Sequence, residues 1–244
     1  GLILAAIAIL FIGDDRRSHK RSLAVSVIAT MIAFLGSITL CEYIFGWNFG
    51  IDRIFISSEA FRQYPGRPSP QTSANFALLG ISLLVYKRRS FPIRLGQVFA
   101  LAVAANAMVA MAGYIFSTTE FYGFPLVSSD IGMAIHTAAS FVLLTAALFG
   151  SRPSEGMMSL VTSATRSGGI ARSIVLTSVL APPLVGALTR IGVYADWYDV
   201  SVQVSLFAII IVGLVLRTTW QAARLSERDE LRAKAAFEES QNVN

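Results

Sequence analysis

Two ionisable side chains within the apolar stretches of this sequence are its main candidates for chemistry. Glu42 lies near the end of one apolar stretch, and His136 lies shortly after the start of another. An ionisable group at membrane depth is a functional-site candidate by default, because burying its charge in hydrocarbon is costly. Glu42 has two interpretations. It is either an interfacial carboxylate paired with an arginine such as Arg67, or a ligand contact or proton-linked group.

His136 also has two interpretations. Its imidazole either hydrogen-bonds to a neighbouring helix or serves as the axial ligand of a haem- or chlorophyll-type ring. His19, the other histidine, belongs to a charged connection between apolar stretches, which argues against a bis-histidine haem. The sequence therefore requires no cofactor, and a single pigment ligand at His136 stays an alternative.

No motif for catalysis is found in the sequence. It contains no phosphate-binding glycine loop, nucleophile elbow or kinase signature. Cys41 is the single cysteine, so the chain can form neither an internal disulfide nor a multi-cysteine metal site. We therefore predict a protein that is not an enzyme and holds no metal.

The elements that position these residues are predicted to be transmembrane helices. Of the 244 residues 54% are apolar and only 14% are charged, against roughly 25% charged in soluble domains. Helix is the default in a bilayer, because backbone groups must be satisfied within the segment. Seven spans are predicted, at 1–13, 22–46, 70–86, 93–117, 131–149, 172–194 and 200–219. The first would be about 20 Å long in a bilayer core of about 30 Å, so we expect the native chain to begin upstream.

The distribution of basic residues predicts the orientation of these spans. Sixteen of the twenty lysines and arginines fall in one alternating set of connections, and the other set holds only Arg53, Arg62, Arg67 and Arg190. By the positive-inside rule, the N-terminus lies outside and the C-terminus lies in the cytoplasm of a bacterial inner membrane. The net charge of +5 then comes from cytoplasmic connections, and no nucleic acid partner is predicted.

The second and third spans resemble the fourth and fifth. The run YIF at 43–45 matches YIF at 114–116, and the pattern TxxxFxLL at 72–79 matches 137–144. Chance similarity between apolar helices is the alternative to a parallel duplication of a helical hairpin. In a duplication Gln71 corresponds to His136 and Glu42 to Gly113. A cleft would then open toward the outer face. Its expected ligand-binding residues are Glu42, Tyr43, Arg67, Asn75, Tyr114 and His136.

The residues after the seventh span predict a helical exit from the membrane. They are rich in Ala, Leu, Glu, Arg and Lys, which are good helix formers, and contain neither Gly nor Pro. We therefore divide the chain into a seven-span domain, 1–219, and a cytoplasmic helical linker or tail, 220–244.

Four stretches of the sequence resemble the multi-pass membrane region that precedes PAS and histidine-kinase modules in many bacterial sensor proteins. They are EYIFG at 42–46 with GID at 50–52, PGRPSP at 65–70, MAIHTA at 133–138, and the amphipathic exit helix. The resemblance covers most of the chain and implies a sensory input domain without catalysis in the membrane. No PAS or kinase module follows in this sequence.

Two functional hypotheses follow. The first is a membrane-embedded sensory domain that responds to a small hydrophobic or amphipathic ligand, or to a membrane state, and transmits the change through its last helix. The second is an accessory subunit of a larger photosynthetic or respiratory membrane complex, holding a pigment or lipid. The expected partners are the lipid bilayer and either other membrane subunits or a second copy of the chain.

Overall fold

The computed structural model describes residues 1–14, 18–47, 49–50, 67–87, 92–118, 121 and 131–242, with side chains described up to residue 224. All regular elements in these ranges are helices. The chain divides into two compact units, Gly1–Ser159 and Leu160–Asn244, which are described separately. The prediction of an all-helical protein is therefore confirmed.

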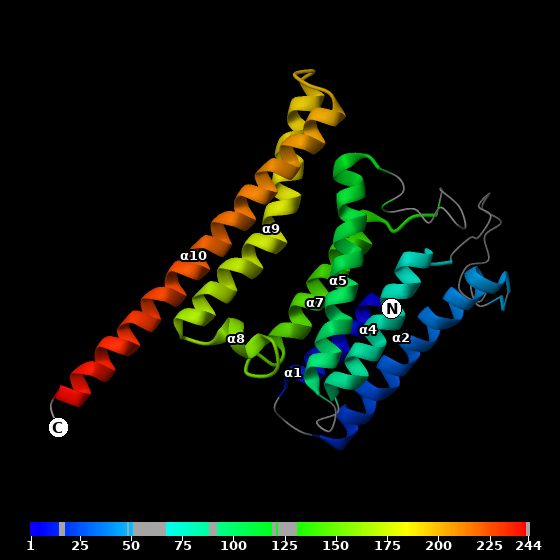
Figure 1. Ribbon diagram of the computed structural model, residues 1–244. Helices are drawn as coiled ribbons and strands as arrows, with labels where there is room; N and C mark the ends of the chain where they lie inside the picture. The colour runs from blue at the N-terminus through cyan, green and yellow to red at the C-terminus, as the bar shows by residue number, and fades with distance from the viewer. Residues whose placement is uncertain are drawn as a thin grey trace. The chain divides into compact units, whose positions relative to one another are not determined.

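In the part of the first unit that the structure describes, five long helices form a bundle (Figure 1). They are α1 (Leu2–Gly13), α2 (His19–Phe45), α4 (Pro70–Lys87), α5 (Ile93–Phe116) and α7 (Ile135–Gly150). Helix α4 packs against α1, α2 and α5, and α7 packs against α1 and α5. Small and aliphatic side chains fill the core between them, among them Ala8, Ile32, Leu79, Leu83, Val103 and Phe141.

Helices α2 and α4 pack with their backbones in contact. A Cβ atom at Gly36 would lie 2.5 Å from the Ala77 nitrogen and from the Ser73 carbonyl oxygen. A Cβ atom at Gly80 would lie 2.5 Å from the backbone nitrogen of Ala33. Small residues allow such close approach in membrane helix pairs. This pair therefore fixes the position of α4 relative to α2.

Helix α4 differs from its neighbours because its buried residues include several polar ones, namely Thr72, Ser73, Asn75 and Ser82. Its contacts with three other helices place these groups inside protein rather than in lipid. The Ser82 hydroxyl, for example, donates to the Gly96 carbonyl oxygen of α5 at 2.7 Å.

Four helices in the described part of the chain are long and apolar enough to cross a membrane. They are α2, α5, α9 (Arg166–Tyr194) and the Val200–Arg224 part of α10 (Val200–Asn242). Helices α1 and α7 are apolar but shorter, and α4 is not among the four. The structure thus supports a membrane protein with four candidate spans, where the sequence predicted seven.

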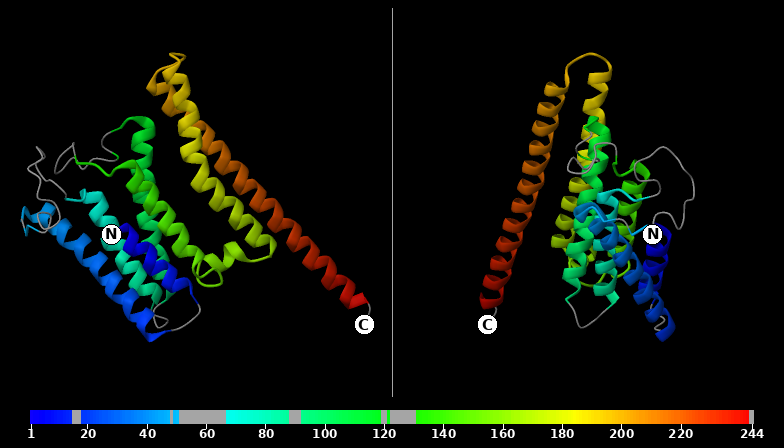
Figure 2. Two further views of the ribbon diagram at one scale, coloured as in Figure 1. Left: turned by 180° about the vertical axis from the view of Figure 1, so that it is seen from behind. Right: turned by 90° about the vertical axis from the view of Figure 1, so that its right-hand side faces the viewer.

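The second unit is a hairpin of α9 and α10, which pack along each other (Figure 2). The Tyr198 hydroxyl donates to the Thr189 carbonyl oxygen at 2.6 Å and closes the turn between them. Gly192 leaves room for the Tyr198 ring, which a Cβ atom there would overlap. Helix α10 continues without interruption through 43 residues, as the exit sequence predicts.

Several helix boundaries differ from those that the apolar stretches predict. Helix α7 begins at Ile135 rather than at 131, and α9 begins at Arg166 rather than at 172. Thr165 caps α9, because its hydroxyl accepts the Gly168 N–H at 3.3 Å. A short helix not predicted from the sequence, α8 (Met158–Thr162), precedes it. Hydropathy finds the apolar stretch, whereas the capping side chain of Thr165 marks where α9 starts.

Candidate functional site

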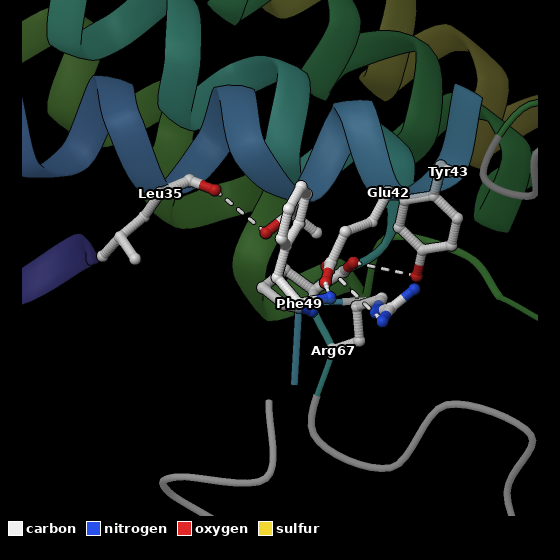
Figure 3. Close-up of polar contacts among 7 residues, drawn as sticks. Leu35, Glu42, Tyr43, Phe49 and Arg67 are labelled. Atoms are coloured by element: carbon white, nitrogen blue, oxygen red, sulfur yellow. Dashed lines mark hydrogen bonds and ion pairs between the residues drawn. The ribbon is translucent and has the colours of Figure 1, made fainter. Parts of the chain in front are cut away.

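The C-terminal end of α2 carries the candidate site, and a glycine shapes it. The helix stops at Phe45, where Gly46 adopts a left-handed conformation with a φ of 66°. The chain then turns back, so the Phe49 N–H donates to Glu42 Oε1 at 2.8 Å (Figure 3). One carboxylate oxygen of Glu42 is thereby satisfied by the backbone that follows its own helix.

The second carboxylate oxygen of Glu42 faces Arg67, which lies just before α4. Arg67 Nη2 and Glu42 Oε2 are 3.4 Å apart, and both side chains are only 3% exposed. Burying two charges costs several kcal/mol for each ion, which their mutual attraction offsets only when they are paired. The structure thus has the pairing that the sequence offered as one interpretation of Glu42.

Tyr43 completes this group of side chains. Its ring lies 5.5 Å from the guanidinium carbon of Arg67, within the range of a cation–π contact. Its hydroxyl donates to the Pro68 carbonyl oxygen at 3.1 Å. We call Glu42, Tyr43, Phe49, Arg67 and Pro68 the Glu42–Arg67 cluster (Figure 3). Its contacts join the end of α2 to the start of α4.

The start of α4 is fixed by its own sequence. Ser69 precedes Pro70 at the first helical position, where proline's missing N–H and fixed φ favour a helix start. The Ser69 hydroxyl accepts the Thr72 N–H at 3.2 Å and donates to the Thr72 hydroxyl at 2.9 Å. Arg67 therefore leads into a capped helix, which limits its freedom to leave Glu42.

Asn75 lies one turn further along α4, in a chain of polar contacts with α5. Asn106 Nδ2 donates to Asn75 Oδ1 at 2.9 Å and approaches the Gln71 carbonyl oxygen at 3.4 Å. Gln71 Nε2 in turn donates to the Phe121 carbonyl oxygen at 3.0 Å. Asn75 Nδ2 is buried and has no hydrogen-bond partner among the described residues. Asn106 was not among the site residues predicted from the sequence, although a polar residue in an apolar span was a signal for it.

Tyr114 and His136 lie outside the Glu42–Arg67 cluster. The Tyr114 hydroxyl donates to the Met133 carbonyl oxygen at 2.9 Å, which joins the end of α5 to the approach to α7. His136 occupies the first turn of α7 with its side chain exposed, and its carbonyl oxygen accepts from Ser140. Its role as a pigment ligand stays a prediction. Of the six expected site residues, Glu42, Tyr43 and Arg67 are in direct contact.

Part of the sequence that carries the resemblance lies outside the described residues. This applies to 51–52 and 65–66 within the GID and PGRPSP stretches, and to Arg53 and Arg62 of the weakly basic connections. Within the described ranges, no group of three or more His, Cys, Asp or Glu side chains is placed to hold a metal ion.

Comparisons with known proteins found no match to this chain among family models, curated proteins or solved structures.

Proposed function

We propose that this chain is a membrane-embedded sensory input domain that transmits a stimulus through its last helix. The observation that carries the proposal is the continuity of α10, which extends from a candidate membrane span to Asn242. Its 43 residues correspond to about 65 Å at ~1.5 Å per residue, more than twice the ~30 Å of a bilayer core. An unbroken helix of this length can carry a rotation or shift out of the membrane.

The proposal includes seven spans with the N-terminus outside and the C-terminus in the cytoplasm of a bacterial inner membrane. The sixteen basic residues on one set of connections support this orientation. Contact with α1, α2 and α5 supports α4 as a span despite its polarity, because its polar groups need no exposure to lipid.

We also propose that the hairpins α2–α4 and α5–α7 are a duplication. Tyr43 and Tyr114 correspond in the sequence, and each donates to a carbonyl two residues before the next helix, Pro68 and Met133 respectively. Phe76 and Phe141 also correspond in the sequence. Their rings pack edge to face, with ring centroids 5.2 Å apart. Contact between equivalent residues is expected near an axis that relates two copies.

The Glu42–Arg67 pair has no counterpart in the second hairpin, and this asymmetry makes it the favoured stimulus site. At the offsets of the duplication, Glu42 corresponds to Gly113 and Arg67 to Gly132. The hydrogen bond from the tyrosine hydroxyl to a carbonyl before the next helix is present in both hairpins. The buried charges of Glu42 and Arg67 are present in the first hairpin alone. A ligand or membrane state that competes for either charge would loosen the link between α2 and α4.

The test uses the chain fused through α10 to a histidine-kinase output module, with basal phosphorylation as the readout. The variants Glu42→Gln and Arg67→Gln each break the same ion pair, so we expect both to shift the output in the same direction. Arg94→Gln removes an exposed arginine at the start of α5 and serves as the matched control. His136→Ala tests the histidine separately.

Wild-type output from Glu42→Gln and Arg67→Gln, both present in the membrane at normal levels, would overturn the site. If basal phosphorylation is also unchanged by truncation of α10 or by helix-breaking substitutions in it, the sensory role is overturned. The accessory-subunit hypothesis then remains.

A further inference from the structure

A second polar region lies at the opposite end of the first unit from Glu42. It is a cavity of about 840 Å³, lined by residues from the ends of α1, α4 and α7 and from the beginning of α2. This volume falls within the ~300–1,000 Å³ typical of small-molecule sites. The proposed orientation places this end on the cytoplasmic side, although the cavity itself does not depend on that orientation.

Charged and hydroxyl side chains line the cavity. The ionisable ones are Asp14, His19, Arg21, Lys87, Arg152 and Glu155, and serines accompany them. Among the lining residues that the structure describes, three permanent cations thus face two carboxylates. Arg21 is paired with Asp14, and Arg152 with Glu155 at 3.3 Å.

Lys87 supplies the excess positive charge. Its Nζ atom donates to the Ser26 hydroxyl, which is a neutral group, and no carboxylate partner is found for it among the described residues. Lys87 is also the last residue of α4, so its charge is held at the rim of the bundle rather than on a free tail.

The wall that carries Arg152 and Glu155 is held in place by Gln97, which is fully buried. Gln97 Nε2 donates to the Glu155 carbonyl oxygen at 3.2 Å, and Gln97 Oε1 accepts the Met157 N–H at 2.7 Å. Gly156 has a φ of 62° and leaves the room that Gln97 occupies. Gln97 of α5 thereby fixes the connection after α7, and with it the position of Arg152 in the cavity wall.

We propose that this cavity binds a phosphate-bearing anion between Lys87, Arg152 and Arg21. A guanidinium presents a planar fork of donors that matches phosphate oxygens, and a lysine adds a compact charge. The cavity serines supply hydroxyl donors, and its volume accommodates an organic group attached to the phosphate. Two sources share this chemistry: the phosphate headgroup of a membrane lipid, or a soluble phosphate ester.

The test measures binding to the purified 244-residue chain in neutral detergent with two probes. The soluble probe is glycerol 3-phosphate, followed by isothermal titration calorimetry. The lipid probe is phosphatidylglycerol added to the same neutral detergent micelles, followed by native mass spectrometry. We expect one bound molecule per chain, and we expect Lys87→Gln and Arg152→Gln each to weaken binding by about tenfold or more.

Lys20→Gln is the matched control for Lys87→Gln, because Lys20 lies beside the cavity in sequence but does not line it. Its affinity should equal that of the wild type. Binding of glycerol 3-phosphate assigns the site to a soluble ester, and binding of phosphatidylglycerol alone assigns it to a lipid. No binding of either probe, or equal losses in all three variants with unchanged helix content, would overturn the proposal. Neither result bears on the signalling test at Glu42.

Discussion

Glu42 and Arg67 are each 3% exposed, and the loss of either one removes the opposite charge that faces the other at 3.4 Å. Removing one charge of such a pair and removing both charges therefore change the stability by different amounts. Removing one partner of a buried ion pair typically costs about 3–5 kcal/mol, whereas replacing both is often close to neutral. Glutamine at position 42 would still accept the Phe49 N–H, so the substitution isolates the charge.

At the residue scale, we expect Glu42→Gln and Arg67→Gln each to lower the free energy of unfolding by about 3–5 kcal/mol. The double variant should be more stable than either single variant, because it buries neither of the two charges. Thermal unfolding of the purified protein in detergent, analysed as a double-mutant cycle, measures the coupling. Additive losses would show that the two charges do not stabilise each other.

The sequence predicted some of these contacts because the residue types limit their partners. An acid at the end of an apolar stretch needs a cation, and Arg67 was a candidate for that role. The contacts of Phe49 and Asn106 could not be found in this way, although Asn106 itself was recognisable as a polar residue in an apolar stretch. Their contacts use a backbone N–H or a common amide, which every segment offers, and only the close packing of α2, α4 and α5 selects them.

At the element scale, the contact between α2 and α4 depends on the absence of a side chain at two positions. We expect Gly36→Ala and Gly80→Ala each to destabilise the chain by about 1–3 kcal/mol, since the added methyl group meets backbone atoms that cannot rotate away. The measurement is again thermal unfolding in detergent.

Gly213→Ala in α10 is the control for these two variants, because a Cβ atom there meets nothing within 4 Å. Alanine is the better helix former, so this variant should be neutral or slightly stabilising. If all three variants behave alike, the close approach of α2 and α4 does not contribute to stability.

Helix lengths show what hydropathy detects and what it does not. Helices α2, α5, α9 and α10 are long and apolar, and both the sequence and the structure identify them. Helix α4 has a polar stripe that is buried by three neighbours, and hydropathy alone cannot tell such a helix from a soluble one. The helix start at Arg166 depends on the Thr165 cap, which lies outside the apolar pattern.

At the scale of the whole molecule, the proposed orientation predicts which connections face the cytoplasm. In a Cys41→Ser background, Trp197→Cys should react with a membrane-impermeant thiol reagent in intact spheroplasts. Ser154→Cys should react only after lysis, because the intervening chain crosses the membrane an odd number of times in the seven-span arrangement. Trp197 and Ser154 are both exposed, so labelling reports the side of the membrane rather than burial.

Labelling of both positions from the same side would contradict the proposed orientation. It would show that the chain between Ser154 and Trp197 does not cross the membrane an odd number of times. Labelling with the two sides exchanged would contradict the positive-inside assignment alone, and would place the Lys87 cavity outside the cell.

The sequence by itself determined the helical class, the presence of helices apolar enough to cross a membrane, and the continuation of the last apolar stretch as a helix. These properties depend on composition and on local hydrogen bonds, which a linear pattern records. Only the tertiary structure decided that Glu42 meets Arg67, that Gly36 and Gly80 bring two backbones together, and that Lys87 and Arg152 share a cavity. These relations join residues far apart in the chain. They depend on how the helices rotate and cross, which the period of hydrophobic residues does not specify when nearly every face is apolar.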